Sequence, residues 1–418
     1  MAELDWHAER TEFPGIALLD NAVENDEIDL KAVRQYRLKR VREQMQKREI
    51  DALILSDPVN IRYATGTRNM QIFSARNTPS RYLLVTEDRT ILYEFTGCMH
   101  LADGFETVDE VRPALTASFV AAGPNIAARE REWAANMMAT IRSLVGQKAT
   151  VGMERMNAGA ALAMAAEGAR LVDAQEAVEM ARAIKSAEEM KCVIASLRAT
   201  EIGVGNLRAA IRPGITENEL WSVLHQTIIS LNGDYCETRL LTSGERTNPW
   251  FQESSSKVIG ENELIALDTD VVGCHGYYAD FSRTFHSGPN KPTEAQRTLY
   301  KTAYEQVQYN LSILKPGMTF REYADQAWNI PPKYFANRYY LSAHGVGMTG
   351  EYPYMYHHAD FPDAGYDGVL MPGMTICVES YIGEEGGSEG VKLEEQVFIT
   401  DSRVELLSKF PFEEELLR

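Results

Sequence analysis

The chain has 418 residues, of which 44% are hydrophobic and 24% are charged, as in a globular protein with room for two domains. The formal net charge of −18 argues against a nucleic-acid partner, which needs a basic surface. The five cysteines are widely spaced and form no C-x-x-C pair, so we expect reduced thiols rather than disulfides or a thiolate zinc site. The sequence shows no signal peptide and no apolar run of about 18 residues, so a cytoplasmic protein without membrane contact is expected.

Regular secondary structure is expected to follow an acidic N-terminal arm, residues 1–33. Residues 34–181 begin with a charged amphipathic helix and the apolar stretches "DALILS", "RYLLVT" and "TILYEF". A long helical segment near 127–146 and an Ala-rich stretch near 158–183 follow. Strands that alternate with helices are typical of an α/β domain, which we predict over residues 34–181.

The pattern changes to long helices near residue 181, where a second domain, residues 182–418, is expected to begin. Pro213 and Gly214 predict a turn, and Thr216 followed by acidic residues predicts the start of the next helix. After residue 235 strands rich in glycine predominate. These strands carry the polar residues that are candidates for function.

The stretch "LDTDVVGCHGYYADFSRTF", residues 267–285, gathers three aspartates. A β-hairpin is predicted, with "ELIALDTDV" and "YYADFSRTF" as its strands and "VGCHG" as its turn. Because side chains alternate along a strand, Asp268 and Asp270 are expected on one face, where Asp280 can meet them. Three buried carboxylates need a cation, and Arg283 or bound metal ions are the candidates. A solvated acidic strand face is the alternative.

Three later residues extend this group. His344 lies between small residues in "AHGVGMTGEYP", Glu379 lies inside the apolar "PGMTICVESYIG", and Glu394 lies inside "GVKLEEQVFIT". A charged residue in the middle of an apolar strand needs a partner. Carboxylates and an imidazole without a thiolate suit divalent Fe, Mn, Co or Zn, and five carboxylates nearly balance two such ions. The predicted dinuclear site has six ligands: Asp268, Asp270, Asp280, His344, Glu379 and Glu394.

The order of these motifs resembles the pita-bread superfamily, which includes methionine aminopeptidase, prolidase, aminopeptidase P and creatinase. The resemblance covers about residues 181–405, and "SDPVNIRYATGTRNMQIF" is similar to the creatinase-type N-terminal domain. It implies an α/β creatinase-like N-terminal domain, an α+β pita-bread metal-binding domain and a homodimer. Two histidines usual in the hydrolases are missing, because "LLTSGERTNPWFQESS" has none and "HGVGMTGEYP" has only His344. Their absence argues against peptide hydrolysis.

Asp270 stands where the peptidases have glycine, and this Asp-x-Asp arrangement resembles the DddP-type dimethylsulfoniopropionate (DMSP) lyases. The stretch "TGTRNMQIFSARNTPSRY" is also similar to that group. The resemblance implies a metal-dependent β-elimination of DMSP to acrylate and dimethyl sulfide, with iron as the first candidate metal and Zn, Mn or Co as others. Tyr339 is matched to the sulfonium-contacting tyrosine of the lyases, and Tyr340 and Phe73 are further candidates for an aromatic contact with the cation. Core packing is the alternative role of these rings.

The lyases are expected to carry an aspartate base six residues after the metal-binding histidine. This chain has Gly350 there and Glu351 next to it, so Glu351 is the candidate base, with an ordinary loop carboxylate as the alternative. The preferred function is a DMSP lyase that acts on a small zwitterionic substrate. The alternatives are an Xaa-Pro dipeptidase or creatinase-like metallohydrolase, a DddP-like homologue with changed or lost activity, and a non-catalytic binding protein on the same scaffold.

Overall fold

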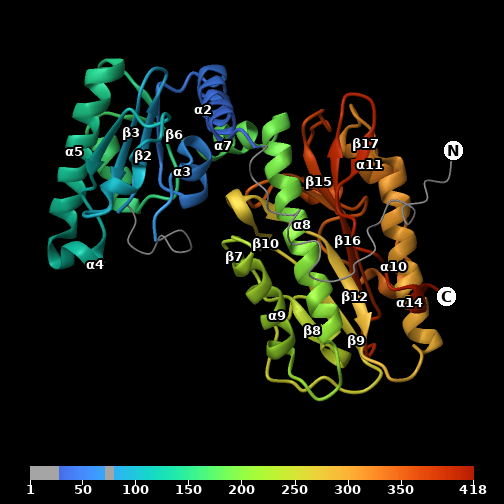
Figure 1. Cartoon of the computed structure of the whole chain (residues 1–418). Coiled ribbons are helices and arrows are strands. Elements are labelled where there is room, and N and C mark those ends of the chain that lie inside the picture. The colour runs from blue at the N-terminus through green and yellow to red at the C-terminus, as the bar shows by residue number, and fades with distance from the viewer. Residues whose placement is uncertain (1–27, 71–79) are drawn as a thin grey trace. The chain divides into compact units, whose positions relative to one another are not determined.

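The computed structural model describes residues 28–70 and 80–418, which divide into two compact units (Figure 1). One unit is Asp29–Arg182, and the other contains Ala183–Arg418. Most of the expected arm, residues 1–33, lies outside the described residues, but helix α2 (Leu30–Lys47) already begins at Leu30. It begins there because the Asp29 side chain caps the helix by accepting a hydrogen bond from the Ala32 N–H. In the described part of the chain, no helix is long and apolar enough to cross a membrane.

The first unit is built on a six-stranded sheet in the order β4-β3-β2-β1-β5-β6. Strand β1 pairs in parallel with β5 and antiparallel with β2. The strands are β1 (Ala52–Leu55), β2 (Tyr82–Thr86), β3 (Thr90–Glu94), β4 (Glu110–Pro113), β5 (Thr150–Met153) and β6 (Arg170–Asp173). The helices after α2 are α3 (Pro58–Thr65), α4 (Phe119–Ala122), α5 (Ile126–Val145), α6 (Ala158–Ala166) and α7 (Gln175–Arg182). The three apolar stretches and the long helical segment near 127–146 therefore form the predicted elements.

The second unit packs helices against three antiparallel sheets, ordered β11-β10-β7, β12-β9-β8 and β14-β13-β15-β16-β17. The helices are α8 (Ala187–Ala210), α9 (Glu217–Ser230), α10 (Glu294–Ile313), α11 (Phe320–Gln326), α12 (Pro332–Phe335), α13 (Phe361–Ala364) and α14 (Glu414–Leu417). The strands before residue 300 are β7 (Tyr235–Cys236), β8 (Leu241–Ser243), β9 (Leu264–Asp268), β10 (Val271–Val272), β11 (Tyr278–Ala279) and β12 (Ser282–His286). The later strands are β13 (Ala343–Val346), β14 (Gly350–Met355), β15 (Thr375–Gly383), β16 (Gly390–Ile399) and β17 (Val404–Leu406).

Local chemistry explains how this unit places its strands. Helix α9 starts where predicted, with a capping box. The Thr216 side chain accepts a hydrogen bond from the Glu219 N–H, and the Glu219 side chain accepts one from the Thr216 N–H. Helix α10 lies against β15 and β16, whose apolar side chains form the main core of the unit. Strands β9 and β12 also lie against β16, and Thr284 Oγ1 donates to the Lys392 carbonyl at 2.9 Å. The hairpin strands and the long β15–β16 pair therefore lie together.

The predicted hairpin is present, but each of its arms is divided between two sheets. Strands β9 and β12 pair with Ser282 opposite Asp268, whereas β10 and β11 pair in the neighbouring sheet. Between β9 and β10 the backbone of Asp270 has a φ of 40°, which is uncommon outside glycine. The expectation that Asp268 and Asp270 share a face of one strand is therefore wrong, because β9 ends at Asp268 and the chain turns at Asp270.

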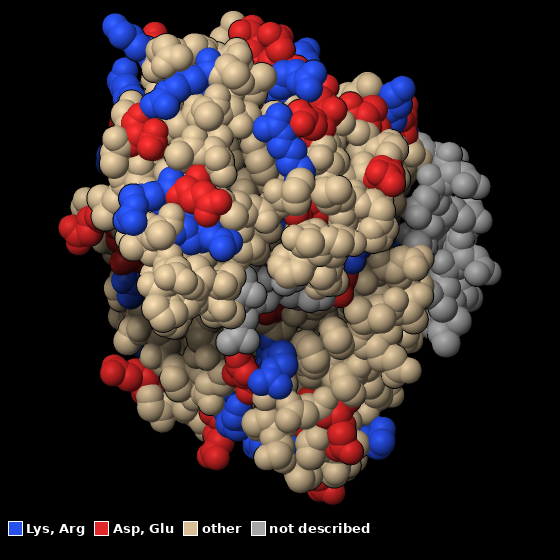
Figure 2. Space-filling model, turned by 90° about the vertical axis from the view of Figure 1, so that its left-hand side faces the viewer, with Lys and Arg blue, Asp and Glu red and all other residues tan. Residues whose placement is uncertain are grey.

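Charges on the surface are mixed. On the face that Figure 2 shows, basic and acidic side chains lie interspersed among uncharged ones. This agrees with a chain that has 42 Lys and Arg against 60 Asp and Glu. All five cysteines lie within the described residues, where they are buried and form no disulfide, as expected for reduced thiols.

Candidate metal centre

Two adjacent strands bring two of the predicted ligands face to face. Glu379 of β15 lies directly opposite Glu394 of β16, and both side chains are buried. Strand β13 pairs with the other edge of β15 and brings in His344. The His344 Nε2 atom lies 3.3 Å from Glu394 Oε1 and 3.7 Å from Glu379 Oε1. Three predicted ligands therefore converge from three neighbouring strands.

The aspartates reach the same place from the divided hairpin. The Asp280 Oδ2 atom lies 3.6 Å from His344 Nε2. Carboxylate oxygens of Asp268, Asp270 and Asp280 lie within 4.8 Å of one another. Asp270 joins them from the turn after β9, where Tyr278 OH donates to its Oδ1 at 3.1 Å. The structure thus brings together all six predicted ligands, although Asp270 arrives by a different route from the one expected.

Several buried oxygens in this group accept no hydrogen bond from the described residues: Asp280 Oδ1, Glu379 Oε1 and Glu394 Oε1. A buried carboxylate oxygen without a donor is costly, and a bound cation can compensate for it. The His344 Nδ1 atom lies 3.0 Å from Gly345 O, which orients Nε2 toward the carboxylates. These donors fit a divalent transition metal, because they offer hard carboxylates and one imidazole.

Lys392 is a functional candidate that the sequence reasoning missed. Its fully buried Nζ lies close to three of the predicted ligands: 2.9 Å from Glu379 Oε2, 2.9 Å from Glu394 Oε2 and 3.3 Å from Asp268 Oδ2. Arg283, the candidate named for this role, instead pairs with Glu395 at 2.9 Å. The signal for Lys392 was its position two residues before Glu394 in a strand, which places both side chains on one face. A single ammonium leaves the five carboxylates with a large excess of negative charge.

This excess of charge perturbs the ionisation of the whole group. Burial, with Glu394 nearby and Lys392 opposing, raises the pKa of Glu379 to about 8. Burial and Asp268 raise the pKa of Asp270 to about 7. Burial also disfavours the charged form of Glu394, but Lys392 and His344 outweigh it and hold the pKa of Glu394 below its usual value. Without a further cation, the group therefore retains protons near neutral pH, and a metal ion would displace them.

The remaining predicted residues differ in their surroundings. Tyr339 is adjacent to it, because its ring centroid lies 4.7 Å from Lys392 Nζ. Tyr340 packs against Tyr339, with ring centroids 4.9 Å apart, and is half-exposed. Glu351 is held in a buried ion pair, in which its Oε1 lies 2.5 Å from Lys185 Nζ. Phe73 lies outside the described residues.

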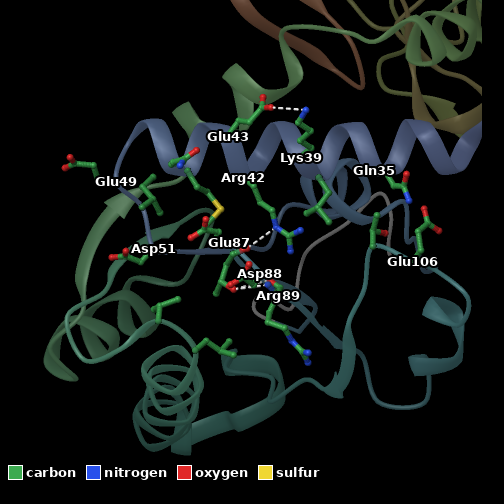
Figure 3. Close-up of a pocket in the computed structure, with 18 residues that line it drawn as sticks. Gln35, Lys39, Arg42, Glu43, Glu49, Asp51, Glu87, Asp88, Arg89 and Glu106 are labelled. Carbon is green, nitrogen blue, oxygen red and sulfur yellow. Dashed lines mark hydrogen bonds and ion pairs between the residues drawn. The ribbon is translucent and has the colours of Figure 1, made fainter.

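A groove of about 990 Å³ lies elsewhere, in the first unit, where α2 and the turn between β2 and β3 line it (Figure 3). Figure 3 shows Lys39, Arg42 and Arg89 in it, together with Glu87 and Asp88. Both signs of charge are present, and the predicted ligands are absent from its described lining. We therefore place the candidate active site at the carboxylate group of the second unit.

Two family models match the chain. The creatinase/prolidase N-terminal domain matches residues 37–184, and metallopeptidase family M24 matches residues 191–401. The chain therefore belongs to metallopeptidase family M24 and carries a creatinase/prolidase N-terminal domain. The predicted ligands all lie within the part that matches family M24.

Individual relatives show how far the similarity extends. The chain is 31% identical to dimethylsulfoniopropionate lyase DddP from Roseobacter denitrificans, over 100% of this chain and 91% of the relative. It is 32% identical to the protein of that name from Roseovarius nubinhibens, over 93% of this chain and 88% of the relative. The structure is similar to the prolidase from Pyrococcus horikoshii OT3, with a TM-score of 0.72, 22% identity and coverage of 90% of this chain and 99% of that one. These findings confirm the predicted creatinase-like α/β domain and the α+β pita-bread domain.

Proposed function

We propose that the protein is a metal-dependent carbon–sulfur lyase that converts DMSP to acrylate, dimethyl sulfide and a proton. The likeness to proteins named DMSP lyase over nearly the whole of both chains carries this proposal. The likeness to a prolidase supports the fold alone, since the identity is 22%. The absence of the two hydrolase histidines also favours the lyase, because it argues against peptide hydrolysis. The stretch before the hairpin has Trp250 and Phe251 and no histidine.

The six predicted residues would hold two divalent transition-metal ions, with iron as the first candidate. Two such ions and Lys392 together would neutralise the five carboxylates, which supports a dinuclear site. When bound, the metal would supply a Lewis acid for the substrate carboxylate and for the negative charge that develops next to it.

The protein side chains account for the rest of the reaction. The rings of Tyr339 and Tyr340 would contact the sulfonium, which aromatic faces attract. Glu351 would take the proton from the carbon next to the carboxylate, and Lys185 supplies the counter-charge that allows Glu351 to be buried. The electron pair of that C–H bond becomes the second bond between the two carbons as the C–S bond breaks. The electron pair of the C–S bond goes to sulfur, so that neutral dimethyl sulfide leaves.

The proposal is tested with purified protein loaded with iron and incubated with DMSP. We expect dimethyl sulfide in the headspace by gas chromatography, and much less from chelated protein. Cleavage of Gly-Pro or Ala-Pro without release of dimethyl sulfide would instead establish the peptidase alternative. The predicted homodimer is tested separately by light scattering, which should give the mass of two chains.

The assignment of the base needs its own variant. Glu351→Gln should lower kcat about 100-fold, since a positioned general base contributes that much or more. Because a neutral amide at this position would leave the Lys185 ammonium without its counter-charge, the double change Lys185→Met with Glu351→Gln is the control for stability. Turnover that is unchanged in both variants would remove Glu351 from the mechanism.

A further inference from the structure

Three aromatic rings form a continuous surface beside the candidate metal centre. The ring centroid of Phe251 lies 5.1 Å from that of Tyr339 and 6.0 Å from that of Tyr340. Phe251 is 55% exposed and Tyr340 is 49% exposed, whereas Tyr339 also contacts the buried Lys392. The aromatic surface therefore extends from solvent to the carboxylate group.

Phe251 holds an unusual backbone conformation. Its φ is 68°, which is rare for a bulky side chain and persists only when the surroundings enforce it. Asn248 anchors the loop, because its Nδ2 donates to Glu384 O at 2.8 Å and to Gly387 O at 2.9 Å. Trp250 anchors it as well, since it is buried with its ring centroid 5.9 Å from that of Tyr381. The loop is thus fixed on both sides of Pro249, and the ring of Phe251 is left exposed.

An exposed ring held in this way is accessible to a ligand of suitable chemistry. A fully methylated sulfonium or ammonium has no N–H to donate, so aromatic faces recognise it instead. The metal ligands lie at the inner end of this surface, where a substrate carboxylate would be bound.

We propose that Phe251, together with Tyr339 and Tyr340, selects substrates by their fully methylated cationic group. This inference rests on the proposed function and adds a specificity-determining residue to it. The ligand class is a small zwitterion with a methylated onium group at one end and a carboxylate at the other. The positive charge, rather than the sulfur atom, decides binding, so a quaternary ammonium analogue also binds.

Two probes of equal shape isolate the charge. They are 3-(trimethylammonio)propanoate and 4,4-dimethylpentanoate, which has carbon in place of the cationic nitrogen. Calorimetric titration of the metal-loaded full chain should show that the cationic probe binds about tenfold more tightly. In Phe251→Leu this preference should fall about threefold to tenfold, because a half-exposed cation–π contact is worth that much. Phe251→Tyr keeps a ring and should keep the preference.

Phe119→Leu is the matched control, because Phe119 is an exposed phenylalanine of the first unit, 67% exposed. It should leave the preference unchanged. An unchanged preference in Phe251→Leu, with a native circular dichroism spectrum, would overturn the inference, and so would a wild-type protein that binds both probes equally. A preference that depends on Phe251 without any release of dimethyl sulfide would uphold the inference and refute the lyase. Release of dimethyl sulfide with a preference that is independent of Phe251 would uphold the lyase and refute the inference about Phe251.

Discussion

Glu394 and Glu395 are consecutive residues of β16 that are equally buried but lie in opposite environments. Glu395 accepts hydrogen bonds from Arg283 Nη2, at 2.9 Å, and from Ser408 Oγ. Glu394 accepts hydrogen bonds at Oε2, from Ser282 and Lys392, but it also faces other carboxylates, and its Oε1 accepts no hydrogen bond from the described residues. Burial of a carboxylate therefore does not by itself mark a metal site. An excess of like charge and oxygens without donors are the features that make this group a candidate.

Because side chains alternate along a strand, Glu394 and Glu395 lie on opposite faces of β16, which we call the Glu394 face and the Glu395 face. The two faces should respond in opposite ways to the loss of a charge. On the Glu395 face each charge has its partner, so removal of one leaves the other stranded in a region of low dielectric constant. On the Glu394 face carboxylates outnumber the single ammonium, so removal of one carboxylate relieves repulsion in the metal-free protein. Metal binding and catalysis should be lost there without loss of the fold.

The largest effect is expected from Glu379→Gln on the Glu394 face. Activity should fall about 1000-fold or more, because the bound Lewis acid lowers the activation barrier by several kcal/mol. The metal-free protein should unfold at the same temperature or higher, since the raised pKa of about 8 means that burial already favours neutral Glu379. Release of dimethyl sulfide, metal content and thermal unfolding measure these effects. Glu405→Gln, at a partly exposed position of the edge strand β17, is the matched control. Full metal content in Glu379→Gln would contradict the assignment.

Arg283→Met tests the opposite face. It leaves Glu395 buried without its cation, which should lower the free energy of unfolding by about 3–5 kcal/mol. The folded protein should still bind metal, because the Arg283 guanidinium pairs with Glu395 rather than with the ligands. Urea unfolding measures the loss. The control is Arg208→Met, which breaks the partly exposed pair with Glu413 and should cost at most about 1 kcal/mol.

The sequence was sufficient for features that depend on local pattern. Glutamates inside apolar stretches predicted both buried strands β15 and β16 and their charged sites, because a charge in such a strand needs a partner. The order of the motifs then predicted the family and the fold, which the comparisons confirm. The site residues themselves stay predictions, although the structure brings the six together.

Features that depend on tertiary contacts were missed. Pattern alone did not distinguish Arg283 from Lys392 as the counter-charge, because the face that each side chain occupies follows from how β12 and β16 pack. A lysine also usually predicts a solvated position, whereas Lys392 is fully buried. The turn at Asp270 was missed because alternation predicts a continuous strand, and the φ of 40° becomes clear only in the folded chain.

Lys392→Met removes the ammonium that lies among the predicted ligands. The metal-free protein should lose about 3 kcal/mol, or about 6–12 °C in Tm, because the carboxylates lose their compensation. Added metal should restore more stability than it gives to the wild type, since the ions would then carry all the positive charge. Calorimetric scans with and without metal measure this difference. Lys392→Arg is the control that keeps the charge, and an unchanged metal-free Tm in Lys392→Met would show that its charge does not matter.

The smallest effect concerns pH. In the metal-free protein the pKa is raised to about 8 for Glu379 and to about 7 for Asp270, so both carboxyls hold protons at pH 6 that a metal must displace. Apparent metal affinity should therefore rise about tenfold per pH unit for each proton released. It should level off only above about pH 9, because His344 must also lose a proton and, although burial lowers its pKa, Glu394 and Glu379 raise that pKa to about 9. Stability of the metal-free fold should change in the opposite sense. The folded carboxyls bind protons more tightly than the unfolded ones, so stability falls from about pH 5 to pH 8.

Titration calorimetry in buffers of different ionisation enthalpy counts the protons that metal binding releases. An affinity that is flat between pH 6 and pH 8 would mean that the carboxylates of the Glu394 face are already ionised, and the contrast with Glu395 would then rest on geometry alone.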